Sequence, residues 1–344
     1  MDNYQRYIAA SRYARWLPEE GRRESWDETV DRLSDFWQER TGDMVPEEVF
    51  ESIRHLEIAP SMRSLMTAGP ALERDNVAGF NCAYVAIDDV RAMDELMYIL
   101  LCGTGVGFSV ERKYINKLPE VPNGIRRDKD QTIVVPDSKI GWAQSFRQLL
   151  SALYSGTWPT WDTSRIRPSG APLKTFGGRA SGPEPLEGLF KFTCEVFQGA
   201  QGRRLSDIEV HDICCKVGEA VVVGGVRRSA MISLSNPSSG TMRGAKTGQW
   251  WSENPQRSLA NNSACYTSKP DFEFFMDEMR ALHESKSGER GFFSRVASEN
   301  IASRNGRRGK KVTVTLEDGS TKTFDGHEMV NGKQAWSLEV GDDA

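Results

Sequence analysis

The sequence has few of the residues that build metal sites or disulfide frameworks. Its 344 residues include six cysteines and four histidines, no two cysteines have the Cys-x-x-Cys spacing, and the histidines are scattered. A structural zinc site needs such clustered ligands, and disulfide frameworks belong to small secreted chains. We therefore predict no metal site and no set of structural disulfides.

Long apolar runs and a large excess of one charge are also absent. The apolar stretch "EAVVVGG" is too short to cross a bilayer, and the start "MDNYQRYIAASRYARW" lacks the apolar core of a signal peptide. The net charge of -4 gives no general attraction to nucleic acid or to an acidic membrane surface. We expect a cytoplasmic protein with neither nucleic acid nor membrane as a partner.

Residues 1–75 are expected to form a helical segment. Trp26, Val30, Leu33 and Trp37 recur at helical spacing and mark one amphipathic face. Residues 60–76 contain two prolines and short polar turns, so we expect a connector there.

Residues 76–308 alternate between strand and helix patterns. The stretch 79–112 is expected to fold as strand, helix and strand, with Asp88 or Asp89 capping the helix. Residues 116–136 carry many charges and turn residues, which indicates a surface excursion, and Asp137 is expected to cap the helix that follows. Further helices are expected over 186–202, 206–221 and 271–285. This alternation predicts an α/β architecture with largely parallel pairing.

Residues 309–344 have a different character. The segment "KKVTVTLEDGSTKTF" alternates apolar and polar residues around Asp318-Gly319, a strong hairpin signal. We predict a small antiparallel appendage, so the expected division is 1–75, 76–308 and 309–344.

Three glycine-rich loops are candidates for ligand binding. "CGTGVGF" is not the dinucleotide fingerprint, and it joins a helix to a strand, which disfavours a Rossmann dehydrogenase. "VVVGGVRRSAMISL" and "KTFGGRASGPEP" each combine glycines with arginine, whose planar fork matches phosphate oxygens. Each loop could also be a tight turn or a bulge with surface arginines. Together the three loops favour a nucleotide or another phosphorylated ligand.

Several long motifs resemble one family. "NCAYVAIDD", "MDELMYILLCGTGVGFSVERKYINKLPEV", "LKTFGGRASGPEPL", "VVVGGVRRSAMISLS" and "QWWSENPQRSLANNSACYTSKPD" are similar to stretches of the adenosylcobalamin-dependent (class II) ribonucleotide reductases, over residues 4–308. The resemblance implies a ten-stranded α/β barrel. This chain would form its N-terminal half, with the helical segment before it and the β-rich appendage after it.

The resemblance also implies roles for individual residues. Cys82 matches the family cysteine that gives electrons to the substrate radical as one half of a redox pair. The implied substrate-binding residues are Asn81, Ser61, Met62, Arg63, Gly103 and Gly105. The implied effector and specificity-loop residues are Gly224, Gly225, Val226, Arg227, Arg228, Ser229, Lys174, Gly178 and Arg179. The implied cofactor is adenosylcobalamin, and the implied partners are a ribonucleotide substrate, a deoxynucleotide effector and an external dithiol reductant.

One family motif has no counterpart in the sequence. The radical cysteine and the catalytic glutamate of the family lie in an Asn-x-Cys-x-Glu loop after "NGRR", and the sequence has "NGRR" at 305–308 with no cysteine beyond it. We expect a split gene whose second polypeptide carries this loop and most of the cobalamin surface. A truncation or an intervening element such as an intein is an alternative, although no Cys or Ser follows residue 308 before Ser320.

The expected activity is therefore ribonucleotide reduction that needs a second polypeptide. An alternative from a different class is a non-catalytic, nucleotide-binding regulator derived from a reductase. Cys102, Cys194, Cys214 and Cys265 lie in apolar patterns and are expected to be core residues. A helical His211 is expected to have a packing or capping role.

Overall fold

The computed structural model describes residues 1–42, 44–171, 179–222, 231–304, 311–315, 321–325, 329–330 and 333–334. The chain divides into two units. The first comprises Met1–Ser235 and Gly240–Asn262, and the second comprises Asn236–Ser239 and Ser263–Ala344. The division into 1–75, 76–308 and 309–344 stays a prediction.

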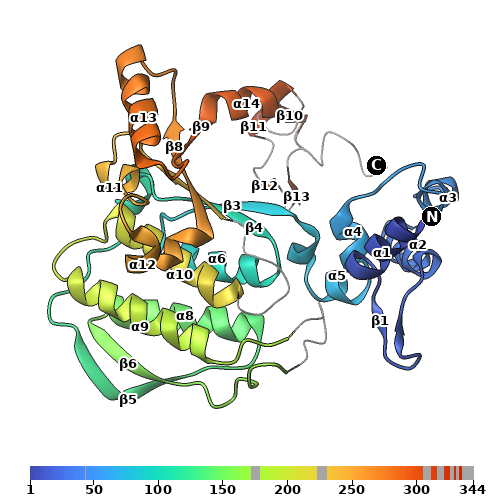
Figure 1. Cartoon of the computed structure of the whole chain (residues 1–344), viewed down its shortest axis with the longest axis horizontal. Coiled ribbons are helices and arrows are strands. Elements are labelled where there is room, and N and C mark those ends of the chain that lie inside the picture. Colours follow the sequence, from blue (N-terminus) through green and yellow to red (C-terminus); the bar gives the residue numbers. More distant parts are fainter. Residues whose placement is uncertain are drawn as a thin grey trace. The chain divides into compact units, whose positions relative to one another are not determined.

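The first unit begins with helices, as the sequence predicts (Figure 1). Its first elements are α1 (Asn3–Arg12), β1 (Trp16–Leu17), β2 (Arg22–Arg23), α2 (Trp26–Thr41) and α3 (Glu47–Arg54). Ser25 and Glu28 form a capping box that satisfies two backbone N–H groups at the start of α2. Helix α2 then buries Val30 and Leu33 in a core shared with Phe50 of α3.

The prediction of a connector at 60–76 is wrong. The chain there forms α4 (Met62–Thr67), α5 (Pro70–Arg74) and the 3-10 turn η1 (Asn76–Gly79). Pro70 occupies the first turn of α5, where its missing N–H breaks no hydrogen bond, so it starts a helix instead of interrupting one. Leu65 and Leu72 join the N-terminal core.

A parallel sheet follows in the first unit. Its strands are β3 (Cys82–Ala86), β4 (Gly105–Ser109), β7 (Met231–Ser235) and the start of β8 (Ala260–Tyr266), in the order β3-β4-β7-β8. The pairs β3–β4 and β4–β7 are parallel, so the expected parallel α/β pairing is confirmed. Val106 and Phe108 of β4 face the core, where α6 (Arg91–Leu101) and α10 (Asp207–Val222) pack. Asp89 accepts a hydrogen bond from the N–H of Arg91 at the start of α6.

A second layer packs against these helices (Figure 1). It contains α8 (Lys139–Tyr154), α9 (Glu184–Gly199) and the parallel strands β5 (Arg126–Val134) and β6 (Thr157–Asp162). The expected surface excursion at 116–136 therefore contains a strand. Its pattern is hidden because most of β5 is exposed and its register shifts between Asp128 and Thr132. The cap of α8 is Ser138 and not Asp137, because the Ser138 hydroxyl accepts from the N–H of Gly141.

Short elements complete the first unit: α7 (Arg112–Ile115), α11 (Gly240–Arg243), α12 (Trp250–Glu253) and η2 (Pro255–Leu259). Among the described residues, no helix is long and apolar enough to cross a membrane.

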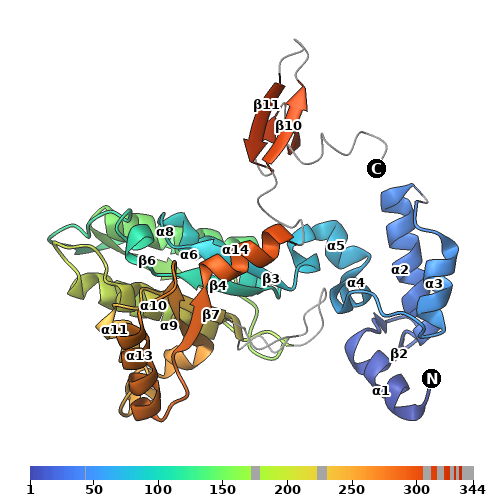
Figure 2. The same ribbon diagram turned by 90° about the horizontal axis from the view of Figure 1, so that it is seen from above.

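The second unit contains α13 (Phe272–Ser285), β9 (Gly291–Ser294) and α14 (Arg295–Arg304). The end of β8 pairs in parallel with β9. The expected hairpin is confirmed as β10 (Lys311–Thr315) and β11 (Thr321–Asp325), an antiparallel pair (Figure 2). The Asp318-Gly319 turn lies outside the described residues. The short strands β12 (Met329–Val330) and β13 (Lys333–Gln334) also pair antiparallel.

Candidate active site

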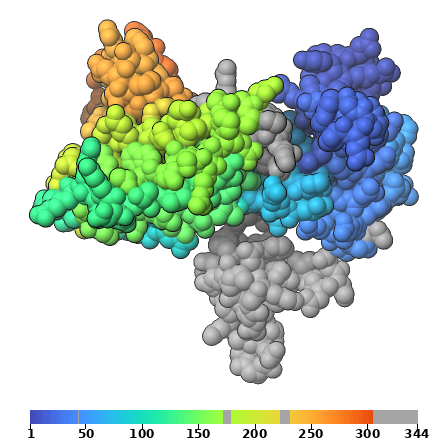
Figure 3. All heavy atoms as spheres, turned by 90° about the horizontal axis from the view of Figure 1, so that it is seen from below, coloured from blue at the N-terminus to red at the C-terminus, as the bar shows by residue number. Residues whose placement is uncertain are grey.

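The main cavity of the first unit has a volume of about 2320 Å³. One wall comes from the N-terminal segment, through residues such as Met62 and Arg74, and the other comes from the sheet and the start of α8. Figure 3 shows the N-terminal helices in dark blue and the α8–α9 region in green, with light blue residues of the intervening segment between them. The space is large enough for a nucleotide, since ligand pockets typically measure about 300 to 1,000 Å³.

The open face of the sheet forms the floor of this cavity. Side chains alternate along a strand, so Gly105, Gly107 and Ser109 of β4 lie on the side away from the helices, and the two glycines line the cavity. Cys82 of β3 pairs in register with Gly105, and its thiol is exposed on this face. The two glycines therefore leave the space beside Cys82 open to a ligand.

Most of the expected substrate residues border this cavity. Those that line it are Asn81, Cys82, Met62, Arg63, Gly103 and Gly105. Gly105 donates its N–H to the carbonyl of Asn81 at 2.9 Å, which fixes the backbone next to Cys82. Ser61 is not part of the lining; it precedes the first turn of α4.

The expected effector residues are described only in part. Lys174 and Gly178 lie outside the described residues, as do Gly224, Gly225, Val226, Arg227, Arg228 and Ser229. Arg179 is described, and its guanidinium donates to the carbonyl of Gly170 at 2.9 Å. It does not line the cavity, so its role as an effector residue stays a prediction.

Gly103 needs its conformational freedom. It has a φ of +80°, a backbone region that residues with a Cβ rarely adopt. Arg63 lies against it and donates a hydrogen bond to its carbonyl oxygen, so an added Cβ would come within 3.2 Å of Nη1 of Arg63. The glycine therefore allows the buried arginine to hold the turn between α6 and β4.

A cluster of four titratable side chains borders the same cavity. Asp75 accepts hydrogen bonds from the Tyr98 hydroxyl at 2.5 Å and from the Cys102 thiol at 2.9 Å. Lys139 places its Nζ 3.4 Å from both the Asp75 carboxylate and the Cys102 sulfur. The four residues come from α5–η1, from α6 and its end, and from the start of α8.

The protonation states in this cluster follow from burial and hydrogen bonding. Burial opposes ionisation of Asp75, but hydrogen bonds from Cys102, Tyr98 and the N–H of Val77, with the charge of Lys139, hold the pKa of the carboxyl below its usual value. Burial, together with its hydrogen bond to Asp75, raises the pKa of the Cys102 thiol to about 11. Cys102 is thus a neutral thiol that donates to a carboxylate.

Sequence reasoning missed this cluster as a group. Cys102 was expected in the core, and its burial is confirmed, but Tyr98, Lys139 and Asp75 carried no signal of a shared site. They are separated by up to 64 residues and meet only through packing. The burial of Cys194, Cys214 and Cys265 is also confirmed. No group of three or more His, Cys, Asp or Glu side chains in the described part of the chain could hold a metal ion.

Comparisons with known proteins bear on the fold and the family. The structure is similar to a solved "B-12 dependent (class II) ribonucleotide reductase", with a TM-score of 0.66, 27% sequence identity, and coverage of 76% of this chain and 45% of that one. The fold is therefore that of a ribonucleotide reductase barrel. Residues 120–196 match the family described as "B12-dependent ribonucleotide reductase, insertion domain".

Curated relatives with similar sequences are reductases of the same cofactor class. An adenosylcobalamin-dependent ribonucleoside-triphosphate reductase of Lactobacillus delbrueckii is 31% identical over 293 residues, covering 65% of this chain and 40% of the relative. The protein of that name from Euglena gracilis is 32% identical over 216 residues, covering 60% of this chain and 29% of the relative. The chain belongs to the class II ribonucleotide reductases and corresponds to the N-terminal portion of their catalytic chain. It spans about two fifths of the length of the Lactobacillus relative.

Proposed function

We propose that this chain forms part of the active site for reduction of ribonucleotides to deoxyribonucleotides, with Cys82 as one half of the redox pair. The observation that carries the proposal is the exposure of Cys82 in a cavity large enough for a nucleotide, while the other five cysteines are buried. Relatives are named as adenosylcobalamin-dependent ribonucleoside-triphosphate reductases, which supports a radical reaction on a ribonucleotide.

The reducing step balances with two thiols. Cys82 and a second cysteine each give up one hydrogen and become a disulfide; the 2′ carbon of the ribose exchanges its hydroxyl for hydrogen, and water leaves. An external dithiol then reduces the disulfide by thiol–disulfide exchange. The backbone around Asn81 and Gly105 holds the Cys82 thiol at the cavity floor, and the proposed substrate residues beside it orient the ribose.

The cofactor and the radical cysteine are proposed to be held mainly by other residues. Adenosylcobalamin, when bound, supplies the initiating radical. The described cavity lining contains no histidine, and the described residues include no group of three or more potential metal ligands, so we assign none of the lining residues to the cofactor and derive no step through it. The sequence contains no Asn-x-Cys-x-Glu, and we propose that a second polypeptide carries this motif.

We also propose nucleotide control of the reaction through the loop Gly224–Ser229. In this proposal Arg227 and Arg228 contact a deoxynucleotide effector, and the loop passes its identity to the substrate base. Lys174, Gly178 and Arg179 are proposed to complete this effector site.

Co-expression tests the proposal. The chain alone should make no deoxyribonucleotide from ribonucleoside triphosphate, adenosylcobalamin and dithiothreitol, measured by chromatography. A downstream polypeptide carrying Asn-x-Cys-x-Glu should restore activity. Cys82→Ser should abolish it, with an unchanged melting temperature because Cys82 is exposed. Cys194→Ala, a change in the buried core, is the matched control and should remain active.

The outcomes separate the alternatives. Product formed by the chain alone would refute the need for a second polypeptide. Full activity of the Cys82→Ser variant in the reconstituted system would refute the redox role of Cys82. Effector binding without activity under any combination would favour a non-catalytic regulator.

A further inference from the structure

The chain reaches Cys82 through a short segment, residues 75–81, between α5 and β3. The regular structure within this segment is the single 3-10 turn η1. The thiol of Cys82 is exposed, and it has no hydrogen-bond partner among the described residues. The place of the thiol in the cavity therefore depends on the backbone of the segment that leads to it.

Both ends of this segment are tied to α6 and to the turn that follows it. Asp75 accepts hydrogen bonds from the side chains of Tyr98 and Cys102. At the other end, Gly105 donates its N–H to the carbonyl of Asn81 at 2.9 Å. The middle of the segment, η1 and the residue after it, is left to a further contact.

Thr104 makes that contact. Its side chain is buried, and its hydroxyl oxygen lies 3.0 Å from the carbonyl oxygen of Val77 and 2.8 Å from that of Phe80. A hydroxyl has one proton to donate, so the two carbonyls share it. The carbonyl of Val77 also accepts the N–H of Phe80 at 3.1 Å, which closes η1. The hydroxyl of Thr104 therefore holds both the turn and the residue by which the chain leaves it.

The backbone that carries this hydroxyl is itself fixed. The N–H of Thr104 donates to the carbonyl of Ile99 in the last turn of α6, at 3.3 Å. The carbonyl of the preceding Gly103 accepts a hydrogen bond from the buried guanidinium of Arg63. A side chain on such a backbone loses little further freedom when it makes a contact, so it can hold a neighbouring segment in place.

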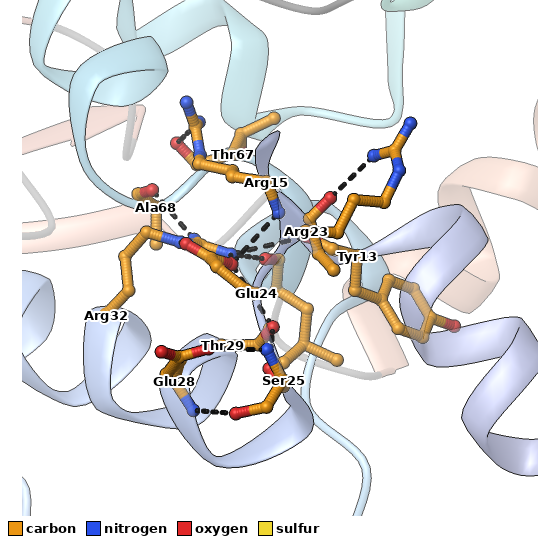
Figure 4. Close-up of polar contacts among 12 residues, drawn as sticks. Tyr13, Arg15, Arg23, Glu24, Ser25, Glu28, Thr29, Arg32, Thr67 and Ala68 are labelled. Carbon is orange, nitrogen blue, oxygen red and sulfur yellow. Dashed lines mark hydrogen bonds and ion pairs between the residues drawn. The ribbon is translucent and has the colours of Figure 1, made fainter. Parts of the chain in front are cut away.

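Another buried threonine of the first unit differs in what its hydroxyl joins. The hydroxyl oxygen of Thr29 lies 2.9 Å from the carbonyl oxygen of Ser25 and 3.2 Å from the carboxylate of Glu24 (Figure 4). Both acceptors lie within five residues along the chain, and Thr29 does not line the cavity. The acceptors of Thr104 are 24 and 27 residues away, on the segment before Cys82.

We propose that Thr104 is a positioning residue for the reaction. Its hydroxyl fixes the backbone of residues 77–80 and thereby the place of the Cys82 thiol in the cavity. The inference rests on the proposed function, because only a reacting thiol needs an exact place beside the ribose. Misplacing a reacting group by about 1 Å can cost about a hundredfold in rate, so a single buried hydroxyl can matter to turnover without touching the substrate.

Two substitutions separate the hydroxyl from the shape of the side chain. Thr104→Val removes the hydroxyl and keeps the shape, and Thr104→Ser keeps the hydroxyl. In the reconstituted system of this chain and the downstream polypeptide, Thr104→Val should lower kcat about a hundredfold and leave KM for the ribonucleotide within about threefold. Thr104→Ser should keep kcat within about threefold of the parent. Thr29→Val, which loses an equally buried hydroxyl away from the cavity, is the matched control and should keep kcat within about twofold.

Hydrogen–deuterium exchange of the chain alone examines the backbone without the reaction. Peptides that cover residues 75–86 should exchange about fivefold faster in Thr104→Val, the effect of one lost neutral hydrogen bond, while peptides of α8 keep the parent rate. In Thr104→Ser and Thr29→Val, residues 75–86 should exchange at the parent rate.

Several results would overturn the inference. They are a parent-like kcat in Thr104→Val, an equal fall of kcat in Thr104→Ser or Thr29→Val, a rise of KM in place of the fall of kcat, and unchanged exchange of residues 75–86 in Thr104→Val. An inactive parent system in which exchange still depends on the Thr104 hydroxyl would remove the proposed function alone. An active parent with an equally active Thr104→Val would remove this inference alone.

Discussion

Acid should weaken the first unit through one buried histidine. His211 lies on α10 with no exposed surface, within 3.0 Å of the Ser233 hydroxyl and stacked on Phe108. Burial, together with the charges of Arg257 and Lys246, lowers the pKa of its imidazole to about 3. Asp212, the next residue along the chain, pairs with Arg257 at 2.6 Å. The folded protein therefore keeps His211 neutral.

The sign and size of the effect follow from proton linkage. In the unfolded chain a histidine takes up its proton near pH 6.5, so below that pH the unfolded state binds one proton that the folded state does not. Stability is lost as the pH falls from about 6.5 toward 3. At pH 5 the unfolded pKa alone sets the loss, about 1.5 pH units at 1.36 kcal/mol each, or about 2 kcal/mol.

Urea unfolding at pH 7 and pH 5 measures this loss. His211→Gln removes the titration and keeps a polar side chain near Ser233, so its free energy of unfolding should fall by about 2 kcal/mol less than that of the parent over this interval. Carboxylates titrate in both proteins and cancel in the comparison. His55→Gln, at an exposed position, is the control and should keep the parent response. An equal fall in the parent and His211→Gln would refute the reasoning.

Three further outcomes are expected. In the second unit, Glu278→Gln should destabilise by about 3 to 5 kcal/mol in chemical unfolding, because it leaves the buried charge of Arg290 without its carboxylate; a loss below about 1 kcal/mol would contradict a buried pair. Gly103→Ala should lower stability by about 1 to 2 kcal/mol, since alanine is strained at a φ of +80°, and an unchanged melting curve would show that the turn adapts. Iodoacetamide at pH 8, followed by peptide mass spectrometry, should label exposed Cys82 well before Cys102, whose thiol has a pKa of about 11; equal labelling would contradict the described environments.

Local sequence patterns were enough to predict the helices and strands whose apolar residues recur with a clear period. The helical face of Trp26, Val30 and Leu33 and the strand-helix-strand pattern of 79–112 both appear in the structure, because each buries one side against a single neighbouring layer. The alternating residues beside Asp318-Gly319 likewise form an antiparallel pair. Where most residues of a strand are exposed, as in β5, no alternating pattern remains, and the strand was not predicted.

The sequence by itself indicated the family, because several long motifs, one of them around Cys82, resemble it as unbroken strings of residues. It could not determine which other side chains border the same cavity as Cys82. Asp75, Tyr98, Cys102 and Lys139 meet through packing of α5–η1, α6 and α8. Such a meeting of residues up to 64 positions apart depends on distances in three dimensions. For that reason only the tertiary structure decided which side chains share a hydrogen-bond network at the edge of the cavity.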